Sequence, residues 1–155
     1  LKIDLSLVNS VVKSNDNRSN LLLKRIKEIM KNKFKNKLIS FLGVTFKANT
    51  DDMRESSSLK MIPFLLKKGA KINYFDPTGQ KKELNKYKNV NFAPSIKKAC
   101  FNSDLIIIHT EWNEFKSINF KNLTKKKNFI VYDMRNIYSP KKMKIDKIKY
   151  FGIGR

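Results

Sequence analysis

Two positively charged side chains follow an apolar run that ends in glycine, in the stretch FLGVTFKANTDDMRESSSL (residues 41–59). Lys47 and Arg54 supply the cations, and Thr50 adds a hydroxyl donor. A helix predicted to begin near Ser56 and Ser57 would add backbone N–H groups that have no partner within the helix. Cations and unpaired helix amides together bind anions, so this loop is a candidate anion site.

The acidic residues of the same loop leave a second interpretation open. Asp51, Asp52 and Glu55 lie close enough in sequence to hold both cations as surface ion pairs. A dinucleotide fingerprint, Gly-x-Gly-x-x-Gly, would close the backbone tightly on a pyrophosphate, but the loop contains only Gly43. Any anion bound here is therefore held mainly by side chains.

A second polar loop, HTEWNEF, also follows an apolar run. We expect Thr110 or Glu111 to cap the helix that comes next, with Trp112 and Phe115 packed beneath it. His109 is the only histidine of the chain. Because no second ligand or nucleophile lies near it in sequence, we interpret it as a side chain at the edge of the core.

A third loop, YDMRNIYSP, places Asp133 and Arg135 at the end of a predicted strand. Arg135 could bind a phosphate through two parallel hydrogen bonds. An ion pair of Arg135 with Asp133 or with Asp76 is the alternative. Asp76 precedes a proline in FDPTG, and turn formation accounts for it.

The elements that position these loops alternate between short apolar runs and helical segments. Such alternation predicts a parallel sheet, so we expect an α/β, Rossmann-like domain with helices on both faces. Ligands of such sheets bind beyond the carboxyl ends of the strands, which here means the loops after residues 43, 76, 109 and 133. The predicted strands are 38–43, 71–76, 90–93, 104–110, 129–135 and an edge strand within 148–155, and the predicted helices are 56–69 (with a serine cap, Pro63 inside and Gly69 at its end), 81–87, 95–102, 112–118 and 120–126.

A long amphipathic helix is predicted to precede this domain, over residues 4–31. At 1.5 Å per residue it would be roughly 40 Å long, more than a small α/β domain needs, so we expect it to connect domains or to pair subunits. We divide the chain into this helix, residues 1–33, and a domain over 37–155. Because the sequence starts without Met inside a helix, we expect it to be the carboxy-terminal piece of a longer protein.

Positive charge dominates the composition. Lys and Arg number 34 against 13 Asp and Glu, which gives a net charge of +21. A nucleic-acid-binding module is one explanation, but the lysines are spread over nearly every segment rather than gathered on one face, which makes nucleic acid an unlikely partner. The single cysteine, Cys100, has no activating neighbour and is expected to be buried. No apolar run approaches the length of a membrane span, so we expect a cytoplasmic protein.

Five motifs in order support a resemblance to a known family: GVTFKANTDDMRESSSL, NYFDP, HTEWNEF, VYDMRNIY and FGIGR. They resemble the carboxy-terminal, UDP-binding domain of the UDP-glucose/UDP-mannuronate dehydrogenase family. NSVVKSNDNRSNLLLKRI is similar to the latter part of the family's central dimerisation helix. The resemblance implies a homodimer formed through the amino-terminal helix.

The resemblance also implies roles for four residues. Phe46 and Lys47 would contact a UDP-sugar, Arg135 would contact its UDP portion, and Arg54 would reach across a cleft to NAD. The family's catalytic cysteine, its glycine fingerprint and most of its NAD site lie upstream of the segment that this chain resembles, so we expect no catalytic residue here and no activity of this chain alone. Ala48 stands where many bacterial members have proline.

Two sugar substrates remain open within the family. UDP-glucose, oxidised to UDP-glucuronate in two NAD-dependent steps, is favoured by TEWNEF and NTDDMR; UDP-N-acetylmannosamine is the alternative. Nucleic-acid binding would differ from both by a steep dependence on salt and by little dependence on Lys47 or Arg135.

Overall fold

The computed structural model describes residues 6–154, which form two compact units that divide after Phe34. The first unit contains one long helix, α1 (Ser6–Ile29). It corresponds to the helix predicted over 4–31, of which residues 4 and 5 lie outside the described residues. Among the described helices, none is both long enough and apolar enough to cross a bilayer.

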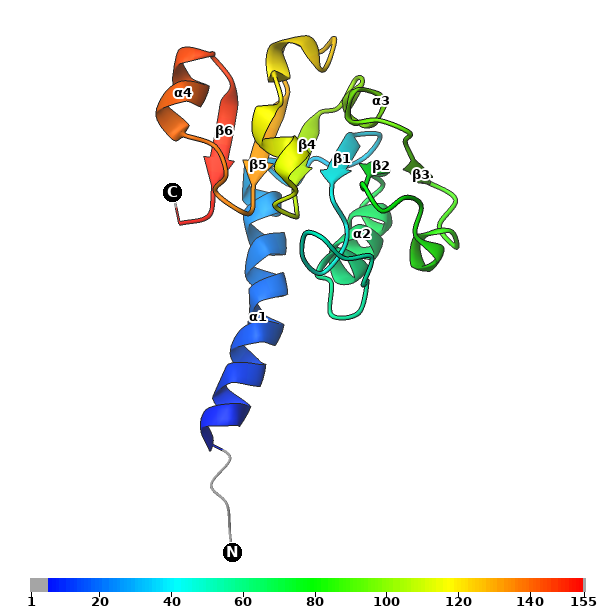
Figure 1. Cartoon of the computed structure of the whole chain (residues 1–155), viewed down its shortest axis with the longest axis vertical. Coiled ribbons are helices and arrows are strands. Elements are labelled where there is room, and N and C mark those ends of the chain that lie inside the picture. Colours follow the sequence, from blue (N-terminus) through cyan, green and yellow to red (C-terminus); the bar gives the residue numbers. More distant parts are fainter. Residues whose placement is uncertain (1–5, 155) are drawn as a thin grey trace, which may run out of the picture. The chain divides into compact units, whose positions relative to one another are not determined.

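The second unit is built on a six-stranded sheet in which every pair of neighbours is parallel (Figure 1). The strand order is β3-β2-β1-β4-β5-β6, so the chain first builds outward from β1 on one side and then returns to build outward from β4 on the other. This is the doubly wound, Rossmann-like arrangement that the sequence predicts. The strands are β1 (Leu38–Leu42), β2 (Lys71–Phe75), β3 (Val90–Phe92), β4 (Leu105–Ile108), β5 (Ile130–Asp133) and β6 (Lys149–Gly152).

The two central strands are covered on both faces. All four residues of β4 are buried, as are the last four of β1. Their short, branched apolar sequences fit a parallel sheet with no exposed face. Phe41 pairs with Ile107 on one side and with Tyr74 on the other, which fixes the register across the middle of the sheet.

Helices lie on both sides of the sheet because crossovers between parallel strands are right-handed. The β1–α2–β2 crossover runs in one direction from the centre and the β4–β5 crossover in the other, which places their connections on opposite faces. One face carries a core cluster that includes Leu42, Ile106, Cys100, Phe115 and Met143. The connections are α2 (Ser58–Lys67), η1 (Lys82–Leu84), α3 (Ile96–Cys100), η2 (Asn113–Ser117), η3 (Phe120–Asn122) and α4 (Pro140–Ile145), where η marks a 3₁₀ helix.

Some helical details differ from the sequence prediction. The segments over 81–87, 112–118 and 120–126 contain only 3₁₀ helices, and α4 was not predicted at all. Proline at its first position and the single buried Met143 make α4 a short helix without a clear apolar period. Pro63 does lie inside α2, and Gly69 follows the end of that helix with φ +85°.

Candidate functional site

The loops after β1 and β4 meet where the strand order reverses. Gly43 directly follows β1 and has φ +76°. A Cβ atom at this position would lie 1.5 Å from Thr110 Oγ1. The His109 N–H donates to the Leu42 carbonyl at 3.0 Å. Only glycine permits this approach, so the ends of the two strands form one continuous edge.

The peptide group of Val44 anchors the loop that follows. Its N–H donates to Asp76 Oδ2 at 2.9 Å. Its carbonyl accepts the hydroxyls of Ser56 and Ser58, both at 2.6 Å. The base of the loop over 45–55 is therefore fixed to the end of β2 on one side and to the start of α2 on the other.

A buried lysine supports the same anchor. Asp76 is 1% exposed, and Lys81 Nζ lies 3.8 Å from Asp76 Oδ1 and 2.5 Å from Thr78 Oγ1. The predicted turn is present, with the Thr78 N–H donating to Asp76 Oδ1 at 3.1 Å. Sequence reasoning missed Lys81 because nothing in a chain so rich in lysine marks one of them as buried.

The amino-terminal end of the loop carries the two residues predicted to contact substrate. Phe46 is 48% exposed and Lys47 is exposed. The Phe46 N–H donates to the Asp52 carbonyl at 2.9 Å, which closes the loop. The Thr50 hydroxyl, predicted as a donor to the anion, accepts the Asp52 N–H at 3.1 Å.

Arg54 is paired within its own loop. Its Nε lies 3.0 Å from Asp52 Oδ1 and its Nη2 lies 2.9 Å from Asp52 Oδ2, a two-pronged ion pair. The ion pair with Asp52 that the sequence left open is therefore present. Hydrogen bonds from the Arg54 side chain are the main reason that the pKa of Asp52 is lowered. The Arg54 side chain nevertheless remains 88% exposed.

Arg135 connects the ends of three strands. It follows β5, its Nε donates to the His109 carbonyl at 2.7 Å after β4, and its Nη2 lies 3.5 Å from the Phe46 carbonyl after β1. Its ion pair is with Glu111, at 2.9 Å between Nε and Oε2. The alternative of a side-chain pair with Asp133 or Asp76 is therefore wrong.

The carboxylate of Asp133 shapes the turn that carries Arg135. It is fully buried and accepts the backbone N–H of Arg135 at 2.9 Å, the N–H of Tyr138 at 3.0 Å and the hydroxyl of Tyr150 at 3.0 Å. Three donors to one carboxylate are enough to satisfy a buried charge. Asp133 therefore fixes the backbone of Arg135 and does not neutralise its side chain.

Asn136 fixes the other end of that turn. Its φ is +53°, and its side-chain amide pairs with the backbone of Ile153, donating through Nδ2 at 3.2 Å and accepting through Oδ1 at 3.0 Å. A Cβ on Gly152 would lie 2.5 Å from Asn136 Oδ1. Asparagine suits this position because it tolerates a left-handed backbone and because its amide resembles a peptide group.

The polar atoms of the HTEW segment are buried to an unusual degree. His109 is 2% exposed, and its Nε2 lies 2.8 Å from Ser57 Oγ. Burial lowers the pKa of His109 to about 3, and the nearby charge of Arg135 makes a smaller contribution in the same direction. Ser57 occupies the N-cap position of α2, but its hydroxyl contacts His109 and does not cap the helix. The sequence correctly predicts a buried histidine and misses this bond.

Four polar atoms of this segment have no hydrogen-bond partner among the described residues: His109 Nδ1, Thr110 Oγ1, Glu111 Oε2 and Trp112 Nε1. Of these, Glu111 Oε2 is held by its ion pair with Arg135. Buried polar atoms without partners are rare and often occur at functional sites. The prediction that Thr110 or Glu111 caps a helix is wrong, since Trp112 stands at the N-cap position of η2. Trp112 and Phe115 are buried, as predicted.

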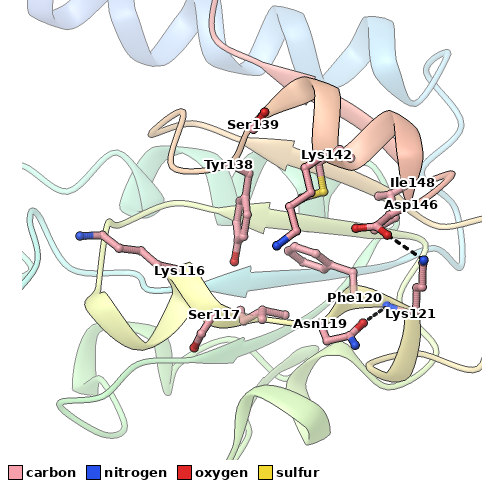
Figure 2. A pocket seen from close by; sticks show the side chains of 12 residues that line it. Lys116, Ser117, Asn119, Phe120, Lys121, Tyr138, Ser139, Lys142, Asp146 and Ile148 are labelled. Atoms are coloured by element: carbon pink, nitrogen blue, oxygen red, sulfur yellow. Dashed lines mark hydrogen bonds and ion pairs between the residues drawn. The ribbon is translucent and has the colours of Figure 1, made fainter.

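A separate pocket of about 300 Å³ lies between the η2–η3 segment and α4 (Figure 2). Phe120 and Tyr138 form its aromatic part, with ring centroids 5.1 Å apart. Its carboxylate, Asp146, is paired with Lys121 at 2.7 Å. The pocket is lined by segments that cover the sheet and by none of the four residues predicted to bind ligand, so it is distinct from the crevice at the strand ends.

The structure brings three of the four predicted residues to one edge of the sheet. Phe46 and Lys47 are adjacent at the amino-terminal end of the loop, and Arg135 reaches the Phe46 carbonyl from the end of β5. Arg54 lies at the other end of the same loop. An exposed aromatic residue whose carbonyl contacts an arginine held at the strand ends is suited to bind a ligand that combines a planar group with phosphates.

Comparison with known proteins finds relatives of this chain among nucleotide-sugar dehydrogenases. Residues 40–140 match the family model for the UDP-binding domain of the UDP-glucose/GDP-mannose dehydrogenase family. UDP-glucose 6-dehydrogenase of Rickettsia felis is 36% identical over 98% of this chain, and that of Rhizobium meliloti is 32% identical over 96%. The chain spans about 35% of the length of these relatives.

Solved structures share the fold. The UDP-N-acetyl-mannosamine dehydrogenase of Staphylococcus aureus matches with a TM-score of 0.73 at 20% identity, covering 97% of this chain and 34% of that one. A UDP-glucose dehydrogenase from Pyrobaculum islandicum matches with a TM-score of 0.70 at 21% identity, covering 84% of this chain and 29% of that one. At these identities the likeness concerns the fold alone.

Proposed function

The chain belongs to the UDP-glucose/GDP-mannose dehydrogenase family, as its UDP-binding domain, and from this premise we propose that the crevice at the ends of β1, β4 and β5 binds a UDP-sugar. In this proposal Phe46 and Lys47 contact the UDP-sugar, and Arg135 binds its UDP portion. The catalytic residues of the complete enzyme are supplied by other parts of that protein.

The observation that carries the proposal is the position of Arg135. Its guanidinium has five N–H groups, of which the Nε donor binds the His109 carbonyl and one Nη2 donor is directed at the Phe46 carbonyl. Glu111 Oε2 lies 2.9 Å from Nε as an ion-pair partner. The Nη1 edge remains for a ligand. A planar guanidinium that is held on one edge can bind a phosphate through the other with two parallel hydrogen bonds.

We propose UDP-glucose as the sugar nucleotide. The relatives from Rickettsia felis and Rhizobium meliloti, which match 98% and 96% of the chain at 36% and 32% identity, are UDP-glucose 6-dehydrogenases. The complete enzyme would oxidise UDP-glucose to UDP-glucuronate in two steps, with NAD accepting a hydride in each. This chain alone is expected to be inactive.

We also propose that Arg54 contacts NAD. The residue fits that role because its side chain is 88% exposed and its Nη1 edge is not used by Asp52. A pyrophosphate could therefore approach without breaking the ion pair.

Homodimer formation through α1 and a cytoplasmic location complete the proposal. Leu21 of α1 is 64% exposed, as an apolar residue at an interface would be in a single chain. Leu21→Asp should halve the mass measured by light scattering; a mass equal to that of the unaltered dimer would refute pairing through this part of α1.

Calorimetric titration tests the substrate site. UDP, UDP-glucose and UDP-N-acetylmannosamine are titrated into this chain and into Lys47→Ala and Arg135→Ala. Saturable binding that is weakened about tenfold or more in both variants is expected, since each removes a charge-assisted contact. Lys127→Ala is the control, because Lys127 is exposed in the loop before β5.

The outcomes separate three readings of the site. Tighter binding of UDP-glucose than of UDP-N-acetylmannosamine supports the sugar assignment, and the reverse order overturns it. Binding that depends steeply on salt and is equally weakened by Lys127→Ala would indicate attraction to the net charge alone and would refute the crevice.

A further inference from the structure

Asp52 holds only one edge of the Arg54 guanidinium. The Nε donor lies 3.0 Å from Oδ1 and 3.2 Å from Oδ2, and one Nη2 donor lies 2.9 Å from Oδ2. An arginine has five N–H donors, so both donors of Nη1 and the second donor of Nη2 remain. One Nη1 donor and the second Nη2 donor lie along the adjacent edge, on a side chain that is 88% exposed.

The carboxylate itself is fixed to the loop. The Asp52 N–H donates to Thr50 Oγ1, the Asp52 carbonyl accepts the Phe46 N–H at 2.9 Å, and Oδ1 accepts the Arg54 N–H at 2.8 Å. The Asp52 side chain is 32% exposed, far less than that of Arg54. A firmly held carboxylate therefore restrains a guanidinium that would otherwise move freely in solvent.

The ion pair is poorly suited to stabilise the fold. Pairs at the protein surface contribute little to stability, because water screens the attraction and two side chains lose their freedom. Restraining an arginine before a ligand arrives has a different effect. The side chain then loses its conformational freedom during folding rather than on binding, so the affinity for the ligand is higher.

We propose that Asp52 is a positioning residue that presents the free edge of Arg54 to the pyrophosphate of NAD. This inference rests on the proposed contact between Arg54 and NAD. Asp52 does not touch the cofactor. It acts through Arg54, and because the same residue closes the loop on Phe46, it sets the cofactor contact in a fixed position relative to the substrate contacts.

Calorimetric titration of NAD into the full-length gene product, and steady-state kinetics of that product with NAD and UDP-glucose, test the proposal. The Kd for NAD is expected to change in each variant as the KM for NAD does. Asp52→Asn keeps the size of the side chain and removes the charge that holds the guanidinium. We expect the KM for NAD to rise about fivefold, the upper range for an exposed ion pair, while the KM for UDP-glucose stays within twofold. Asp52→Glu should restore part of the loss.

A control variant and a double variant show whether the effect of Asp52→Asn acts through Arg54. Asp51→Asn is the matched control, because Asp51 is the adjacent exposed carboxylate and lies outside the pair. It should leave both KM values unchanged. In Arg54→Ala, the additional change Asp52→Asn should have no further effect on the KM for NAD, since the two residues act as one unit.

Several results would overturn the proposal. If Arg54→Ala raises the KM for NAD and Asp52→Asn does not, the positioning role fails and the cofactor contact stands. If Asp52→Asn raises both KM values equally, Asp52 serves the loop as a whole. If Arg54→Ala leaves the KM for NAD unchanged, or the unaltered protein shows no turnover, the proposed function fails and this inference with it.

Discussion

Replacing Gly43 with alanine measures how tightly the loops after β1 and β4 are packed together. Gly43 has φ +76°, and an added Cβ would lie 1.5 Å from Thr110 Oγ1 and 2.9 Å from Thr110 Cβ. The left-handed backbone costs alanine roughly 1–2 kcal/mol. Displacing Thr110 costs roughly 1–3 kcal/mol more. We therefore expect Gly43→Ala to lower the free energy of unfolding by about 2–5 kcal/mol.

Urea unfolding followed by far-UV circular dichroism measures this loss, and Gly79→Ala is its control. Gly79 has φ +86° but no atom within 4 Å of an added Cβ, so its substitution reports the backbone cost alone. Gly43→Ala combined with Thr110→Ala should recover part of the contact cost. Equal losses for the two glycine variants, within about 0.5 kcal/mol, would refute the tight approach.

Three other substitutions test single features of the site. Asp76→Asn leaves the buried Lys81 without its counter-charge and should lower the free energy of unfolding by about 3 kcal/mol in urea titrations. The control is Asp51→Asn, at an exposed carboxylate, which should leave the free energy of unfolding unchanged. Because the folded protein keeps His109 neutral with a pKa of about 3 while the unfolded chain protonates it near pH 6.5, the free energy of unfolding should fall by about 1.4 kcal/mol per pH unit below 6.5. His109→Gln should abolish that part of the slope between pH 6.5 and 5, and an unchanged slope would contradict the burial. Asn136→Ala loses two hydrogen bonds and strains a left-handed residue, so it should lower the free energy of unfolding more than Asn136→Gly does; equal losses would show that the φ of +53° carries no cost.

The sequence predicted secondary structure best where the pattern and the length of an apolar run both indicate the same element. LISFL and LIII are too short for helices and too apolar for an exposed sheet, so they predict buried parallel strands. The position of the crevice followed, because ligand loops in such sheets lie at the carboxyl ends of strands. The helix α4 was missed, since its sequence PKKMKI has one buried residue and no apolar period.

Side-chain partners were the least predictable part of the site. Arg135 pairs with Glu111 and with the His109 carbonyl, two partners supplied by another strand. A local sequence pattern cannot show such contacts, because they depend on how strands are ordered in the sheet. The same limit applies to Lys81, whose burial depends on the turn that Asp76 begins.

Residues that contact each other in the crevice are separated by different numbers of residues along the chain. These separations bear on the order in which parts of the sheet fold. Val44 and Asp76 are 32 residues apart, whereas Phe46 and Arg135 are 89 apart. Closing the longer loops costs more chain entropy, so we expect the β1–β2 half to form before β5 joins. The contacts of Arg135 are then absent from the folding transition state. A nucleotide bound at this edge should slow unfolding and leave the folding rate unchanged.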